Sequence, residues 1–215
     1  MVITENSENK KGAAKRKTAF SSLKAQEKRA RQDVIVDAAQ RVFATKPFNK
    51  VSIRDVAREA GISHASIYRY FPDQQALFVE AFLRGAKEIV QVLDDIVRNS
   101  EQGDIEKVTE EFVTYLIEND QYFRMMTHFM LDGSLSAEMV EKLNAMERLL
   151  FDEFDKLFRK MAGAGEEDVR LLSHAFFAAL NGVLITFRNY PGRNREEVIR
   201  HMRRIAGIIA NKFKA

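Results

Sequence analysis

The apolar positions along the chain follow the period of the α-helix almost throughout. In the stretch 23–45, which Pro47 ends, the expected buried positions are Val34, Ile35, Ala38, Val42 and Phe43. Similar patterns cover about 73–98, 104–119, 121–131, 134–162, 166–190 and 195–213, and glycine, proline or small polar residues separate most of them. The sequence therefore predicts an all-α protein of nine or ten helices.

Residues 52–71 contain two short helical patterns that meet at one glycine. Ser52 and Ser63 each precede an apolar-periodic run, so each side chain is predicted to accept a hydrogen bond from a first-turn amide. Gly61 stands between them, where a left-handed residue would close the first helix. Two helices joined in this way are typical of a helix-turn-helix, whose second helix enters the DNA major groove by its N-terminal end. Double-stranded DNA is therefore the first partner that the pattern predicts.

The second of these helices carries groups that suit a DNA surface. Small and polar side chains at its start would lie nearest the base edges, while the hydroxyl and guanidinium groups one turn later suit phosphates. One of its two tyrosines is expected to pack inward. We predict a DNA-binding set that consists of Lys50, Ser52, Ser63, His64, Ala65, Ser66, Tyr68, Arg69 and Tyr70.

A family resemblance is carried by the stretch VIVDAAQRVFATKPFNKVSIRDVAREAGISHASIYRYFPDQQALF within residues 30–78. It resembles the opening domain of the tetracycline-repressor (TetR) family of bacterial transcriptional regulators. Its landmarks are Phe43-Ala44, the start of the run at Ser52, Gly61-Ile62-Ser63, Tyr68 and the Tyr-Phe-Pro of 70–72. Pro47 replaces the usual glycine, and Gln74 replaces a lysine that would contact phosphate. The resemblance implies an N-terminal three-helix helix-turn-helix domain and a larger helical ligand-binding and dimerisation domain.

Charge divides the chain into two unlike parts. Residues 1–75 hold fifteen Lys and Arg against eight Asp and Glu, a net charge of +7, and the remainder has a net charge of −4. This asymmetry would direct one part toward a polyanion. We expect a disordered basic arm over 1–22, either a solvated tail or a contact for phosphates or a minor groove, then a DNA-binding domain over 23–75 and an effector-binding and dimerisation domain over 76–215.

The middle helices concentrate aromatic and thioether side chains, which line adaptable pockets for apolar ligands. Ordinary core packing is the alternative for each of these residues. A polar end of the ligand, an acid or a carbonyl, could be held by His128, His174, Asn181 or Arg124. The predicted pocket for a hydrophobic effector with an acyl or aromatic body consists of Phe112, Tyr115, Tyr122, Met126, Phe129, Met130, Phe154, Phe177 and Asn181.

The last two helical patterns carry long faces of small and apolar residues. The resemblance implies that such helices pair with the same two helices of a second copy, which suits a palindromic operator. Closure of the core of a monomer is the alternative. The predicted homodimer interface includes Ala175, Ala179, Gly182, Val183, Ile205 and Ile209.

Other classes of protein find little support in the residues. The chain has no cysteine, and its four histidines form no metal or catalytic motif, so we expect no metal, no cofactor and no enzymatic activity. No signal peptide or membrane-spanning run is evident, which favours a soluble cytoplasmic protein. The resemblance implies that it is bacterial. A repressor released by its effector is the favoured function. An effector-blind DNA-binding protein or a ligand-dependent activator would share the same first 78 residues, whereas a carrier of apolar cargo would leave 52–71 without a role.

Overall fold

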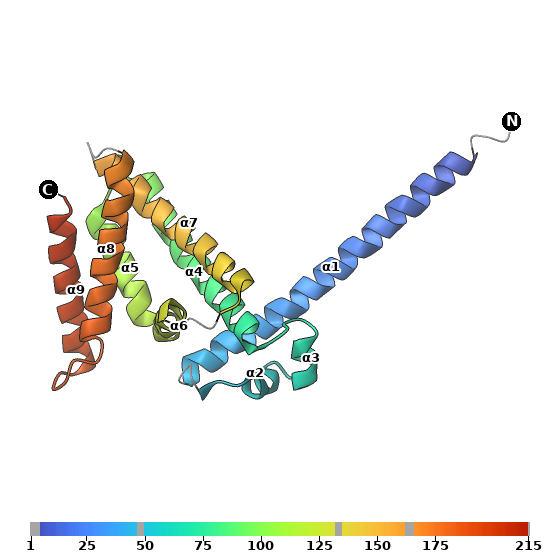
Figure 1. The fold of residues 1–215 in the computed structure, drawn as a ribbon, viewed down its shortest axis with the longest axis horizontal. Helices are drawn as coiled ribbons and strands as arrows, with labels where there is room; N and C mark the ends of the chain where they lie inside the picture. The colour runs from blue at the N-terminus through green and yellow to red at the C-terminus, as the bar shows by residue number, and fades with distance from the viewer. Residues whose placement is uncertain (1–4, 47–49, 132–134, 162–165, 215) are drawn as a thin grey trace. The chain divides into compact units, whose positions relative to one another are not determined.

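The fold consists entirely of helices over the part of the chain that the structure, a computed structural model, describes, namely residues 5–46, 50–131, 135–161 and 166–214 (Figure 1). This confirms the all-α fold class. By contacts, the chain divides into two compact units, Met1–Leu77 and Phe78–Ala215. The helices are α1 (Glu5–Thr45), α2 (Ile53–Glu59), α3 (His64–Tyr68), α4 (Gln74–Asn99), α5 (Ile105–Glu118), α6 (Asp120–Leu131), α7 (Ala137–Met161), α8 (Glu166–Phe187) and α9 (Arg195–Lys212).

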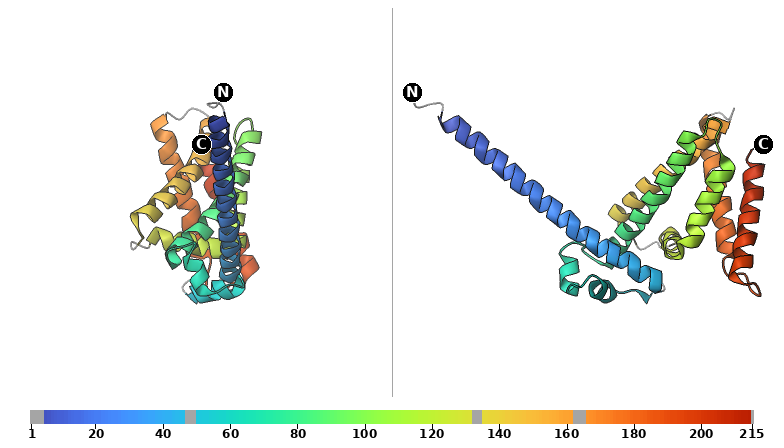
Figure 2. Two further views of the ribbon diagram at one scale, coloured as in Figure 1. Left: turned by 90° about the vertical axis from the view of Figure 1, so that its right-hand side faces the viewer. Right: turned by 180° about the vertical axis from the view of Figure 1, so that it is seen from behind.

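The first unit has a small apolar core to which α1, α2 and α3 contribute. α2 packs against the C-terminal part of α1 and against α3 (Figure 2). Ile35 and Ala38 of α1, Val56 of α2 and Ile67 of α3 are each at most 1% exposed. The helical period predicted the α1 members of this core, except that Val34 is 52% exposed because it lies one position off the buried stripe.

α1 is longer than the sequence pattern indicated. It begins at Glu5, whereas a start near Leu23 was expected. The disordered basic arm expected over 1–22 stays a prediction. Residues 1–4 lie outside the described residues. No proline precedes Pro47, and Lys, Arg, Ala and Glu are strong helix formers, so this segment forms a helix without an apolar face to bury. All side chains of 20–31 are exposed, and a contact of the arm with DNA stays a prediction.

The second unit has an aromatic core between α5, α7 and α8. α8 packs against α5, α7 and α9, and α5 packs against α6 and α9. Phe154 of α7 meets Phe112 of α5 and Phe176 of α8 edge to face, with ring centroids 5.7 and 5.4 Å apart. All three rings are at most 1% exposed. This cluster holds the three helices together.

α8 contains an apolar stretch that the sequence pattern did not bring out. Its residues 168–187 are long and apolar enough, by length and composition alone, to cross a membrane. In the structure, however, 44% of this stretch is buried inside the helical unit, against α5, α7 and α9. α8 therefore packs as a core helix of the second unit.

Candidate nucleic-acid interface and ligand cavity

The start of α2 is fixed by a reciprocal capping box. The Asp55 amide donates to the Ser52 hydroxyl at 3.3 Å, and the Ser52 amide donates to the Asp55 carboxylate at 3.0 Å. Lys46, which follows α1, donates to the same carboxylate at 2.6 Å. The hydrogen bond from Lys46, followed by those from Ser52, lowers the pKa of Asp55 to about 2. The cap thus joins the end of α1 to the start of α2.

This cap predicts a loss of stability in acid. Because the pKa of Asp55 is 3.8 when unperturbed and about 2 in the fold, its contribution is present above pH 3.8 and is lost as the pH falls toward 2. We expect Asp55→Asn to lower the free energy of unfolding at pH 7 and to flatten its fall between pH 4 and 2. Urea titrations of both proteins at several pH values measure this, and parallel pH profiles would contradict it.

α3 is fixed in place on its inner side and at its N-terminus, and its outer face is exposed. The Ser66 amide donates to the Ser63 hydroxyl at 3.2 Å, and the two hydroxyl oxygens lie 2.8 Å apart. Ile67 is fully buried. Gly61, at φ +67°, makes the left-handed turn into the helix, as the sequence predicts. The outer face carries small, hydroxyl and basic groups on a short rigid helix, which suits close approach to a groove.

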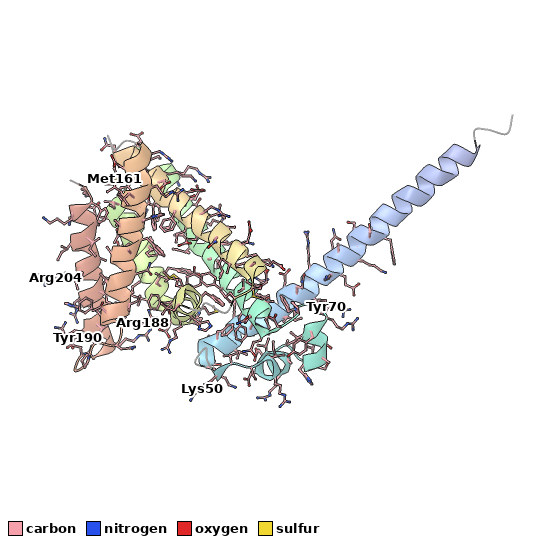
Figure 3. The ribbon with its side chains drawn as sticks, in the orientation of Figure 1. Lys50, Tyr70, Met161, Arg188, Tyr190 and Arg204 are labelled. Atoms are coloured by element: carbon pink, nitrogen blue, oxygen red, sulfur yellow. The ribbon has the colours of Figure 1, made fainter. Side chains whose placement is uncertain are left out.

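The nine residues of the predicted DNA-binding set differ in exposure. His64, Ala65 and Arg69 are exposed, as is Lys50, and Tyr68 is 50% exposed. Ser52 and Ser66 are half-buried and take part in the caps. Tyr70 is the tyrosine that is half-buried, and its carbonyl oxygen accepts a hydrogen bond from Gln32 at 3.4 Å. Figure 3 labels Lys50 and Tyr70 on this unit. Their contacts with DNA stay a prediction.

A cavity of about 350 Å³ lies in the second unit between α4, α6, α7 and α8. Five of the predicted pocket residues line it, namely Tyr122, Met126, Phe129, Met130 and Phe177. The other lining residues are Phe82, Ala86, Ile89, Val90, Leu135, Val140, Leu143, Asn144, Met146, Glu147 and Leu150. The cavity is thus mainly apolar, at the lower end of the range of roughly 300–1,000 Å³ that ligand pockets occupy.

Four of the predicted pocket residues do not line this cavity. Phe112 and Phe154 belong to the packed aromatic core. Tyr115 donates its hydroxyl to the Gly85 carbonyl at 2.8 Å, and the Asn181 amide donates to the Phe177 carbonyl at 3.0 Å. The Tyr115 bond thus joins α5 to α4, whereas the Asn181 bond lies within α8, and neither residue lines the cavity. In a helix that is apolar on several sides, the spacing of the apolar residues does not distinguish residues that pack in the core from residues that line a cavity.

The other candidates for holding a polar ligand end also lie elsewhere. His128 is exposed at the surface, and His174 is exposed with its ring 4.4 Å from that of Phe151. Arg124 forms an ion pair with Asp120. None of the three lines the cavity described above. Their expected role in holding an acid or carbonyl is therefore not supported by their positions.

The contribution of α4 to the cavity was missed in the sequence. One wall of the cavity is formed by apolar residues at helical spacing, namely Phe82, Ala86, Ile89 and Val90. This spacing equally indicates ordinary core packing. Gly85 lies on the same helix, and a Cβ there would stand 2.9 Å from the Tyr122 ring. This close approach accompanies a parallel stack of Phe82 on Tyr122, with centroids 4.9 Å apart.

An apolar surface on α8 and α9 stays uncovered in the single chain. Leu171, Ile185 and Ile208 are 67%, 62% and 56% exposed. Among the predicted interface residues, Ala175 and Gly182 are exposed, and Ala179, Ile205 and Ile209 are half-buried. Val183 is only 5% exposed in the single chain, and its place in a dimer interface stays a prediction. We call Leu171, Ala175, Gly182, Ile185 and Ile208 the α8–α9 face.

Comparisons with known proteins agree with both units. Residues 35–81 match the family described as bacterial regulatory proteins, tetR family. An uncharacterised HTH-type transcriptional regulator of Haemophilus influenzae is 28% identical over 110 residues, which are 50% of this chain and 54% of the relative. This chain therefore aligns with about half the length of that relative.

Solved structures share the fold over most of the chain. A TetR-family regulator from Mesorhizobium loti has a TM-score of 0.65 at 16% identity and covers 86% of this chain and 97% of its own. The Bacillus subtilis regulator FadR in complex with stearoyl-CoA has a TM-score of 0.65 at 14% identity, over 82% of this chain and 96% of its own. The family match thus places residues 35–81, which contain the helix-turn-helix, among the bacterial regulatory proteins of the tetR family, and the solved structures show that this chain shares their helical fold over most of its length.

Proposed function

We propose that the protein is a homodimeric cytoplasmic repressor that a hydrophobic small molecule releases from a palindromic operator. The observation that carries this proposal is the course of α4. This single helix begins at Gln74 in the first unit, and from Phe82 to Val90 it supplies one wall of the cavity. A ligand that favours one position of α4 would therefore shift the helix-turn-helix to which α4 is joined.

The energetic requirement on such a ligand is modest. A dimer that reads a palindrome holds its two recognition helices about 34 Å apart, or one turn of DNA. To shift the equilibrium between bound and released forms tenfold, the ligand must favour the released form by about 1.4 kcal/mol. The similar FadR structure holds stearoyl-CoA, which supports a ligand-binding role for this helical fold.

The α8–α9 face supports the homodimer. Its apolar residues are exposed in one chain and include Ala175 and Gly182, whose small side chains permit close approach of another helix. Two copies that bury this face against each other would form a self-complementary two-fold interface. The resulting pair of α3 helices would match a palindromic operator.

We expect some residues of α3 to determine which DNA sequence is preferred and others to determine the affinity for any DNA sequence. We predict that His64→Ala changes which operator sequence is preferred, because His64 is exposed at the start of α3, nearest the base edges. Tyr68→Phe should weaken binding to all sequences by about three- to tenfold, because it removes one hydroxyl from a phosphate contact. Fluorescence anisotropy with a panel of operators measures both. Unchanged preference in His64→Ala would contradict this docking, and Gln91→Ala on exposed α4 surface serves as the control.

One experiment tests the proposed function as a whole. Genomic footprinting would identify the operator, and anisotropy would then follow its release as extracts of cellular lipids and aromatic compounds are added. Native mass spectrometry of the purified dimer would show any retained ligand as added mass. Operator binding that no compound alters would indicate an effector-blind regulator, and binding that a compound strengthens would indicate the opposite response.

A further inference from the structure

The lining of the cavity carries charge of one sign. Among the lining residues, Glu147 is the one with a formal charge at neutral pH, and Asn144 stands one turn before it on α7. Both are exposed, so they mark the solvent side of the cavity, whereas Phe82, Ala86 and Ile89 of α4 are buried. No ion pair joins Glu147 to another of the residues that the structure describes. The negative charge at this side is therefore not neutralised within the described protein.

The inner wall presents aromatic faces and sulfur rather than cationic groups. Phe82 and Tyr122 stack at 4.9 Å, and the Phe129 ring meets Phe82 at 5.5 Å and near right angles. Met126 and Met130 add thioethers. The face of an aromatic ring carries partial negative charge and attracts an ammonium group, most strongly where water is excluded. Ring faces offer no such attraction to a carboxylate.

Tyr122 adds a hydroxyl to this wall. The residue is 6% exposed and lines the cavity. Burial raises the pKa of Tyr122, so the hydroxyl stays neutral. A neutral phenol both donates and accepts hydrogen bonds, so it provides a polar contact inside the cavity without adding charge.

We infer that the cavity accepts an amphiphile with a hydrocarbon body and a single ammonium end, and that Glu147 faces the ammonium. This inference rests on the proposed function and specifies its ligand class. The apolar body replaces water along α4, α6 and α8, while the cationic end lies near Glu147 and Asn144. A carboxylate end at the same place would instead meet the like charge of Glu147 and find no cation in the lining.

Three probes with the same number of carbons test the sign of the charge. Dodecylammonium, dodecanol and dodecanoate bury similar hydrocarbon, so differences in their affinity report the polar end. Isothermal titration calorimetry on the intact protein at pH 7, below the micelle concentration of each probe, measures the three dissociation constants. We expect dodecylammonium to bind at least about tenfold more tightly than dodecanoate, a difference of about 1.4 kcal/mol. Equal affinities, tighter binding of dodecanoate, or no binding of any probe would overturn the inference.

A matched pair of variants assigns the preference to the cavity. Glu147→Gln should reduce the ratio of the dodecylammonium to the dodecanoate affinity by about threefold to tenfold, because it removes the one charge of the lining. Glu141→Gln removes the same charge from an exposed position of α7 outside the cavity and should leave the ratio unchanged. An equal effect of both variants would show only general attraction to the negative charge of residues 76–215 and would contradict the assignment.

The same probes separate this inference from the proposed function. Operator release is followed by anisotropy in parallel with binding. Release by dodecanoate and not by dodecylammonium would leave a ligand-responsive repressor in place and refute the cationic ligand class. Tight, Glu147-dependent binding of dodecylammonium without any change in operator affinity would keep the ligand class and refute the repressor mechanism.

Discussion

Phe154→Ala should lower the free energy of unfolding by about 3–5 kcal/mol, the largest effect on stability that we expect from a single change. Phe154 is fully buried, and its ring packs against Phe112 of α5 and Phe176 of α8. Truncation removes contacts to both helices and leaves a void that close-packed neighbours fill only in part. For a chain of this size, the melting temperature should fall by about 6–20 °C.

A second truncation serves as the control for this prediction. Phe129 is also buried, at 8% exposed, but its ring borders the existing cavity. Because one side of the ring already lacks packed neighbours, Phe129→Ala should destabilise the fold by less, near the lower end of the range. Urea and thermal unfolding of both variants measure the difference. Equal losses would indicate that Phe154 is not part of a tighter core than the cavity wall.

The helix-turn-helix could be predicted from the sequence because its signals are local. Ser52, Gly61 and Ser63 each fix the backbone within a few residues of themselves, through caps and a left-handed turn. The start of α1 was placed wrongly because the prediction required an apolar face for a helix. Helix-forming residues without a breaking proline suffice for the backbone pattern that the structure describes from Glu5.

The cavity could be predicted only in part because it depends on contacts between distant segments. α6 was recognised from its aromatic and methionine content, and Tyr122, Met126 and Phe129 do line the cavity. The period of α4 or α7 reveals which residues share a face, but not whether that face meets a packed neighbour or empty space. Glu147 was missed for this reason, since a charged residue on an amphipathic helix is ordinarily a solvated one.

For α8, too, the sequence does not show which of its two apolar sides is buried in the core of the chain. Val183 and Ile185 are two positions apart and both apolar, yet the first is 5% and the second 62% exposed. A helix that is apolar on both sides gives no sequence signal for which side belongs to its own core. An exposed apolar side of this kind is expected to meet a partner.

The α8–α9 face therefore predicts the largest effect on DNA binding. The double variant Leu171→Asp and Ile185→Asp should convert the proposed dimer to a monomer, because each pair of copies would bury four uncompensated carboxylates. Loss of the second DNA-binding unit should weaken operator binding by about 10²–10⁴-fold, since both units no longer bind as one assembly. Analytical ultracentrifugation measures the oligomeric state, and anisotropy measures the affinity.

Leu149→Asp provides the matched control for this variant. Leu149 is 49% exposed on α7, outside the α8–α9 face, so the substitution adds a charge to an exposed apolar position without touching the proposed interface. It should leave both the dimer and the operator affinity unchanged. A dimer that survives the double variant, or one that Leu149→Asp disrupts, would place the interface elsewhere. We expect two DNA-binding units to be required, because a single α3 offers too few base contacts for specific binding on its own. A monomer that retains full operator affinity would refute this requirement.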